Sequence, residues 1–193
     1  MSAIIVSFPP GAGGNHLRNI ISHRDNLDTL LSVYDTKNIT AHLSPGNNIK
    51  KDDIDIVLLD QLSTHVLHGH FGEIMSFHNE IQKLKDKKFI ILSPDSSIDR
   101  AMLNLRRQRL GKEYNSIKDN DYFNGEQVFL YEPLMYQYYF QLQLENIMNI
   151  SISEWFASDI TLVVERINRF CNFKIDTIKA STLHNIWIEG NIK

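Results

Sequence analysis

The chain has 193 residues, 20 Lys and Arg against 23 Asp and Glu, a formal net charge of −3 and one cysteine. This charge excludes the strongly basic class of nucleic-acid-binding domains, and no apolar run is long enough to span a membrane. A single cysteine excludes an internal disulfide and predicts a reducing, cytoplasmic setting, and the length fits one domain over residues 1–193.

Residues 3–8 are a short apolar, β-rich run ended by two prolines. We expect a buried strand there and not a signal peptide, which would need a basic flank. A helix is predicted over 17–23, with a further helical turn through Leu31. Residues 35–53 are polar and contain Pro-Gly and Asn-Asn, which indicates a loop. Residues 54–62 are apolar and ambiguous between helix and strand.

Further along the chain, strands are predicted over 64–71, 88–92 and 147–152. Helices are predicted over 72–85, 98–110, 126–145 and 160–173. We expect Gly111 to end the second of these helices and Pro133 to interrupt the third. Cys171 lies on the apolar side of the last helix, so its thiol is expected to be buried and unreactive. The last twenty residues are expected to be irregular. Strands that alternate with helices predict an α/β fold in three layers, with a mostly parallel central sheet flanked by helices.

A glycine-rich loop, Phe-Pro-Pro-Gly-Ala-Gly-Gly-Asn-His over residues 8–16, joins the first strand to the first helix. Glycine lets a backbone turn with positive φ and lets its N–H groups approach a ligand closely. Together with the helix N-terminus, those N–H groups form an anion site. The predicted ligand-binding residues of this loop are Gly11, Ala12, Gly13, Gly14, Asn15 and His16. We expect Gly13 to lie at the rim of the site, away from the core. The alternative is that the glycines only make a tight turn.

The loop departs from a Walker A motif, which has Lys and then Ser or Thr after its last glycines. Gly14 and Asn15 occupy those two places. The usual positive charge on the terminal phosphates and the usual magnesium ligand are therefore missing, which disfavours ordinary ATP or GTP hydrolysis.

Three histidines, His65, His68 and His70, occur within six residues of the second predicted strand, and His78 follows. His68 and His70 share one face of a strand, and histidine suits general-base chemistry near neutral pH. A zinc site is the rival interpretation, but it needs three or four converging ligands. Packing inside the fold is the expected role of His65 and His78.

Arginines follow the third predicted strand. Arg100 falls in the first turn of the next helix, near the strand end where ligands collect, and a phosphate is a suitable partner for it. Arg106, Arg107 and Arg109 lie toward the C-terminal end of that helix, where they complement the helix dipole. We expect these three to be on a solvated face.

These segments, in this order, resemble the sulfotransferase branch of the P-loop folds. Residues 10–15 fall on the P-[KR]-S-G-T-T loop, which holds the 5′-phosphosulfate of 3′-phosphoadenosine 5′-phosphosulfate (PAPS). Residues 67–71, Leu-His-Gly-His-Phe, look like the H-G-H strand of uronyl 2-O-sulfotransferases, where a histidine is the catalytic base. Residues 89–100 look like the R-D-P-x-E-R stretch that binds the 3′-phosphate. Residues 150–173 are similar to the late strand and helix of this fold.

The resemblance departs from the family pattern at the cofactor charges. The loop's Lys or Arg is Gly11 here, and its threonines are Gly14 and Asn15. The first Arg of the third-strand motif falls at Ser93, and the expected serine one turn later is Leu103 or Asn104. Two positive charges that the family places on its cofactor are therefore absent.

The resemblance implies transfer of a sulfuryl group from PAPS to a hydroxyl of a small-molecule or carbohydrate acceptor, without a metal, nucleic acid or membrane partner. Arg100 with Asn104 would hold the 3′-phosphate, and His70 or His68 would take the hydroxyl proton. Residues 35–53 and 112–140 would recognise the acceptor. The alternatives are a P-loop nucleotide-binding enzyme or kinase with an atypical loop, and a non-catalytic, degenerate member of the fold.

Overall fold

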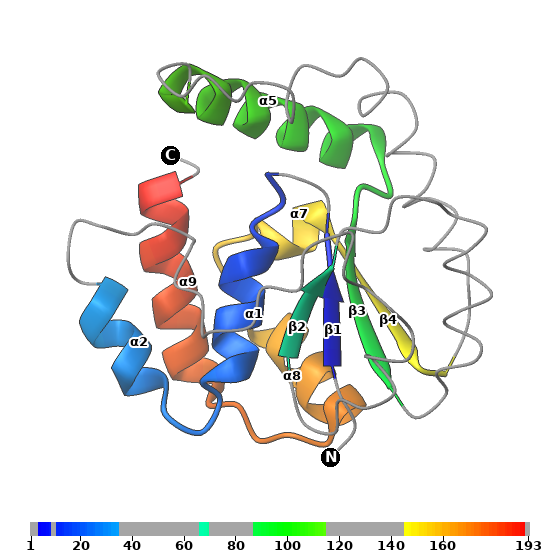
Figure 1. Cartoon of the computed structure of the whole chain (residues 1–193), viewed down its shortest axis with the longest axis vertical. Helices are drawn as coiled ribbons and strands as arrows, with labels where there is room; N and C mark the ends of the chain where they lie inside the picture. The colour runs from blue at the N-terminus through cyan, green and yellow to red at the C-terminus, as the bar shows by residue number, and fades with distance from the viewer. Residues whose placement is uncertain (1–3, 9–10, 35–65, 70–86, 115–144, 192–193) are drawn as a thin grey trace.

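The computed structural model describes residues 4–8, 11–34, 66–69, 87–114 and 145–191. Within these ranges, four parallel strands form one sheet in the order β2-β1-β3-β4 (Figure 1). The strands are β1 (Ile4–Ser7), β2 (Val66–Gly69), β3 (Lys88–Ser93) and β4 (Ile147–Ser151). Each lies within two residues of a predicted strand at either end, and the predicted α/β class with a parallel sheet is confirmed.

The strand order sets where a ligand would bind. The chain passes from β1 to β2 on one side, and then crosses to β3 on the other side of β1. In an open parallel sheet such a reversal of strand order leaves a crevice at the carboxyl ends of the strands, which is the usual ligand position. The glycine loop follows β1 and the next helix follows β3, so both flank this switch point.

Six helices belong to the described ranges: α1 (Gly14–Ser22), α2 (Leu27–Tyr34), α5 (Ser97–Tyr114), α7 (Ile152–Trp155), α8 (Thr161–Cys171) and α9 (Thr177–Asn191). Figure 1 shows α5 crossing the carboxyl end of the strands, at the top of the view. Helices α1, α2 and α9 lie together on one side of the sheet, and α8 lies toward its amino end.

Both faces of the sheet are buried. Side chains alternate between the two faces of a strand, and Val6 and Ile90 belong to the main hydrophobic cluster with helices α1, α8 and α9. Their neighbours Ile5, Phe89 and Ile91 are equally buried on the opposite face. A strand buried on both faces reads as a continuous apolar run, which is why the short runs in the sequence located the strands well.

Two predictions about helices are wrong. Gly111 does not end α5, which continues to Tyr114. The last twenty residues are not irregular, because α9 covers most of them. The buried positions of α9 repeat at helical spacing: Ala180, Leu183, His184, Trp187 and Ile188. The sequence carried this pattern, but a histidine in the middle of the apolar positions hid it.

Cys171 is buried, as predicted, and burial raises the pKa of its thiol to about 11. Among the described helices, none has the length and apolar character needed to cross a membrane. The predicted loop over 35–53, the segment 54–62 and the predicted helices over 72–85 and 126–145, with Pro133, lie outside the described residues.

Candidate anion-binding site

The glycine loop has the backbone conformation that its sequence predicts. Gly11 and Gly13 have φ values of 85° and 74°, which side-chain-bearing residues rarely adopt. Gly13 is the N-cap of α1, and its carbonyl oxygen accepts hydrogen bonds from His16 N and Leu17 N at 3.0 and 3.3 Å. The first turn of α1 carries no acidic residue. A helix N-terminus with this geometry suits an anion through its N–H groups and its dipole, so this edge of the sheet is the candidate anion site.

Close packing explains the second and third glycines of the loop. A Cβ atom on Gly13 would lie 2.4 Å from the ring of Trp187, and one on Gly14 would lie 1.8 Å from the ring of Phe8. The expectation that Gly13 lies at a rim is wrong, because Gly13 is buried under the C-terminal helix. A side chain at this position would disturb the fold itself, so a loss of ligand binding in such a variant would not isolate the loop.

Arg106 of α5 reaches the same place. Its Nη1 atom lies 3.0 Å from the position that a Gly13 Cβ would take. Its guanidinium carbon lies 4.5 Å from the centre of the Trp187 ring and 5.5 Å from that of Phe156. Arg106 is only 6% exposed, so the prediction of a solvated face is wrong for it. It shares the inward side of α5 with the buried residues Asp99 and Leu103, at helical spacing.

The guanidinium of Arg106 lacks an ordinary partner. Its Nε and Nη1 atoms are buried without a hydrogen-bond partner, and among the described residues no carboxylate forms an ion pair with it. Burial lowers the pKa of Arg106 to about 10, which still leaves the group charged at neutral pH. The site therefore contains a desolvated positive charge beside the glycine loop.

Asp99 fixes the start of α5 against the strand ends. Its Oδ2 atom accepts hydrogen bonds from Ser96 N at 3.0 Å and Ser96 Oγ at 2.9 Å, and Ser96 Oγ accepts one from Asp99 N at 3.1 Å. Its Oδ1 atom accepts a hydrogen bond from Ser153 N, at the start of α7, at 2.5 Å. These bonds tie α5 to α7 and so hold the helix that carries Arg106 in place.

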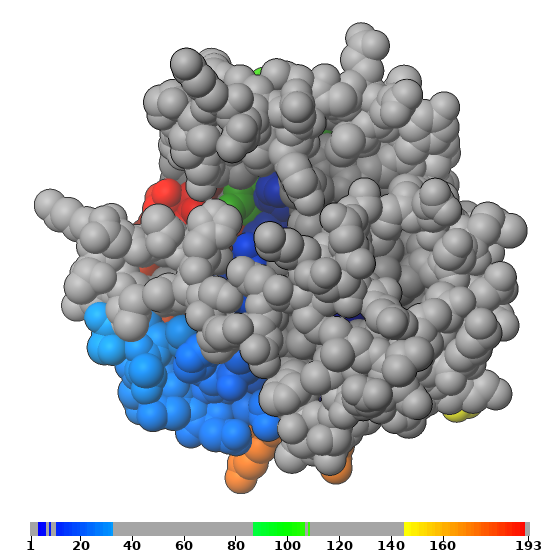
Figure 2. Space-filling view, in the orientation of Figure 1, coloured from blue at the N-terminus to red at the C-terminus, as the bar shows by residue number. Residues whose placement is uncertain are grey.

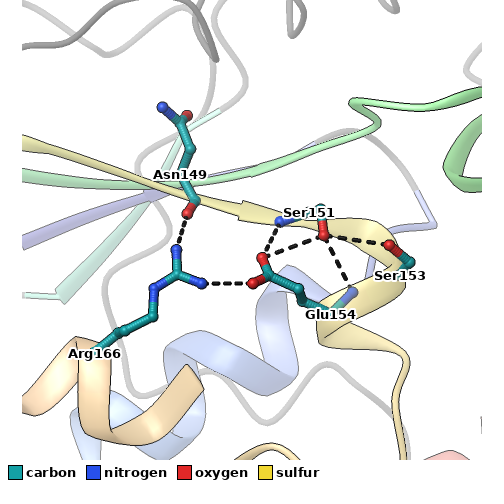
Figure 3. A network of polar contacts seen from close by, with 5 residues as sticks. All are labelled: Asn149, Ser151, Ser153, Glu154 and Arg166. Atoms are coloured by element: carbon teal, nitrogen blue, oxygen red, sulfur yellow. Dashed lines mark hydrogen bonds and ion pairs between the residues drawn. The ribbon is translucent and has the colours of Figure 1, made fainter. Parts of the chain in front are cut away.

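A second polar network supports α7 from below (Figure 3). Ser151 and Glu154 form a capping box, in which Ser151 Oγ accepts from Glu154 N at 3.2 Å and Glu154 Oε2 accepts from Ser151 N at 3.0 Å. Arg166 of α8 donates to Glu154 Oε1 and to the carbonyl oxygen of Asn149, both at 2.6 Å. This network fixes the junction between β4 and α7.

An aromatic cluster joins the loop to α9. The rings of His16 and Trp187 stack at 4.7 Å with an interplanar angle of 7°, and His184 and Trp155 complete the cluster. Burial, followed by the charges of His184 and Arg106, holds the pKa of His16 well below its usual value. Burial lowers the pKa of His184 to about 4, and its Nε2 atom lies 3.0 Å from the carbonyl oxygen of Ala157. Both imidazoles are neutral at pH 7.

The predicted ligand-binding residues of the loop lie around the N-terminus of α1, but His16 differs from the others. Its backbone N–H bonds to Gly13 and its ring is buried in the aromatic cluster, so it supports the loop from inside. Arg100 is half-buried in the first turn of α5, and Asn104, one turn further on, is exposed. In Figure 2 the blue N-terminal, green middle and red C-terminal parts of the described chain meet in a recess.

Of the two histidines predicted to act as the base, only the backbone of His68 belongs to the described residues. Strand β2 pairs with β1 so that His68 is level with Val6 and Gly69 with Ser7. The strand with the H-G-H motif therefore ends at the same edge as the glycine loop. His65, His70 and His78 and the side chain of His68 lie outside the described residues. Within the part of the chain that the structure describes, no three His, Cys, Asp or Glu side chains are grouped as a metal site would require.

The similarity of this chain to known proteins lies in its fold. No protein-family model and no curated protein matches the chain. Among solved structures, the chain is similar to the mouse sulfotransferase SULT7A1, determined as a complex with PAP, with a TM-score of 0.51 and 10% identity. The fold is sulfotransferase-like. The match covers 95% of this chain and 63% of the mouse enzyme, so the chain spans less than two thirds of that protein.

Sequence reasoning missed two residues that lie beside the glycine loop, Arg106 and Trp187. Arg106 was obscured because its helix carries several arginines and no clear apolar stripe. Trp187 was missed together with α9. Ser93, which stands where the sulfotransferase motif has an arginine, is buried, and its Oγ atom has no hydrogen-bond partner in the part of the chain that the structure describes.

Proposed function

We propose that the chain binds PAPS at its glycine loop and transfers the sulfuryl group to the hydroxyl of a small-molecule or carbohydrate acceptor. The observation that carries this proposal is the loop itself: it contains two left-handed glycines, of which Gly13 caps α1, at the switch point of a sulfotransferase-like sheet. The similar mouse enzyme was determined as a complex with PAP, which is PAPS without its sulfuryl group.

The loop backbone would do the electrostatic work of the reaction. N–H groups of residues 11–15, together with the positive end of the α1 dipole, would hold the phosphosulfate. As the S–O bond to the phosphate breaks, negative charge grows on the leaving phosphate, and fixed donors stabilise that charge without reorganising. The 3′-phosphate would pair with Arg100, with Asn104 beside it on the same side of α5.

A histidine of the H-G-H strand would act as the base. The acceptor oxygen forms a bond to sulfur while its proton moves to His70 or His68, and PAP leaves with the electron pair of the broken bond. The register of β2 against β1 supports this assignment, because Gly69 is level with Ser7 at the beginning of the glycine loop. A base one residue later in the chain would come from the same edge of the sheet.

Ligand-induced thermal stabilisation tests the proposal against its alternatives. PAP at about a hundred times its Kd should stabilise the chain by about 2.7 kcal/mol, and ATP with Mg²⁺ should raise the melting temperature less. A larger shift with ATP and Mg²⁺ would favour a nucleotide-binding enzyme or kinase. No shift with either would favour a non-catalytic member of the fold. Sulfuryl transfer from PAPS to a panel of hydroxyl acceptors, lost in His70→Ala, would then establish the reaction.

A further inference from the structure

Arg106 is a buried cation whose environment does not satisfy it. Moving a guanidinium out of water is costly unless hydrogen bonds and an opposite charge replace the lost hydration. The contacts described for Arg106 are the faces of Trp187 and Phe156, and cation–π attraction offsets only part of that cost. Among the described residues, its Nε and Nη1 atoms have no hydrogen-bond partner, and Arg106 is only 6% exposed to water. An anion is the partner that such a group lacks.

The position of Arg106 indicates where that anion would bind. Nη1 lies 3.0 Å from the point where Gly13 would carry a side chain, so the guanidinium is at the loop whose N–H groups and helix dipole attract negative charge. The helix that carries Arg106 is held in place, because Asp99 ties the start of α5 to α7. The guanidinium also packs over the rings of Trp187 and Phe156, and a side chain already held in place loses less entropy on binding.

We propose that Arg106 is the cation of the glycine-loop site and supplies the positive charge that the loop lacks at Gly11. It would contact the phosphate that the loop holds, which is the 5′-phosphate of PAPS or PAP. This inference rests on the proposed function, but it concerns a phosphate group and not the transfer reaction. It also separates Arg106 from Arg100, whose proposed partner is the 3′-phosphate.

Calorimetric titration of the full chain with PAP tests this role. Arg106→Gln should weaken binding by about 10- to 150-fold, the range expected when one charged hydrogen bond is lost. Arg106→Lys keeps the charge and should restore part of the affinity. Because Arg106 contacts the 5′-phosphate, the factor should be similar for adenosine 5′-monophosphate. Arg169→Gln is the matched control, since Arg169 is exposed on α8, and it should leave the Kd unchanged.

Stability of the unliganded variants separates binding from packing. If Arg106 serves the ligand, Arg106→Gln removes an uncompensated buried charge and the melting temperature should stay level or rise. A lower melting temperature with an unchanged Kd would overturn the inference and leave a packing role. Should Arg106→Gln fail to fold, Arg106→Lys decides the matter, because a Kd equal to that of the parent would show that the guanidinium makes no specific contact.

Inorganic pyrophosphate distinguishes this inference from the proposed function. If the parent binds PAP and Arg106→Gln binds it equally well, the inference fails and the proposed function stands. If the parent binds pyrophosphate but not PAP, and Arg106→Gln loses pyrophosphate, the anion site stands and the PAPS function fails. A parent that binds neither ligand overturns both.

Discussion

Two arginines in different regions of the molecule meet opposite conditions. Arg166, which joins α8 to the β4–α7 junction, is partly exposed and donates to a carboxylate and a backbone carbonyl, both at 2.6 Å. Arg106, on α5 beside the glycine loop, is more deeply buried and contacts aromatic rings. Among the described residues, Arg166, which holds the scaffold, therefore has hydrogen-bond acceptors, whereas the Nε and Nη1 atoms of Arg106, beside the loop, have none. This difference is typical of a functional site, where local stability is given up for binding.

Removing Trp187 should have the largest effect on the loop region. The indole is fully buried and packs on His16, Phe156 and Arg106. Trp187→Ala should lower the free energy of unfolding by about 3–5 kcal/mol, because the cavity cannot collapse completely. Chemical denaturation measures this loss, and Ile178→Ala is the control on the same helix, since Ile178 is 79% exposed. Equal losses in the two variants would show that α9 does not pack tightly on the loop.

Acid should destabilise the loop region next. The pKa of His184 is about 4 in the folded chain against 6.5 when unfolded. As the pH falls below 6.5, His184 therefore binds a proton in the unfolded chain but stays neutral in the folded chain. Stability should decline by about 3 kcal/mol until the pH reaches about 4, and His16 should add to the decline. Melting curves from pH 7 to 4 measure this slope. His184→Gln should make it shallower, and an unchanged slope would contradict the assignment.

The scaffold network should give the smallest effect. Arg166→Gln should cost about 1 kcal/mol, because the ion pair with Glu154 is partly exposed and solvent weakens it. PAP affinity should not change, since none of the residues in this network is a proposed contact of the ligand. Denaturation and calorimetry on the same variant measure both quantities. A weaker Kd for PAP in Arg166→Gln would mean that the scaffold and the site are coupled, and that Arg166 also contributes to ligand binding.

Local patterns predicted the elements whose signal lies within a few residues. The four strands were found because each is a short apolar run between turn residues, and the loop was found because Gly11 and Gly13 mark positive φ. The sulfotransferase-like fold followed from the order of the motifs and is supported by the structural match. One domain over residues 1–193, a cytoplasmic location and the roles of Arg100, Asn104, His68 and His70 stay predictions.

The missing part of the site depends on contacts between distant segments. Trp187 lies more than 170 residues from Gly13 in the sequence, and no local pattern shows that its ring fills the space beside that glycine. Arg106 was predicted to be solvated because it lies with other arginines near the end of a helix, where charged side chains are usually exposed. Only the packing of α5 across the strand ends shows that this particular arginine is buried and aimed at the loop.

The most direct test of the loop as the ligand site is an NMR titration of the chain labelled with ¹⁵N-glycine. The sequence has nine glycines, so the spectrum is simple enough to assign. PAP should shift the amide resonances of Gly11, Gly13 and Gly14 strongly, because the proposed function places the phosphate at their N–H groups, and it should leave Gly190 of α9 unchanged. Saturable PAP binding that leaves the three loop glycines unmoved would contradict the account.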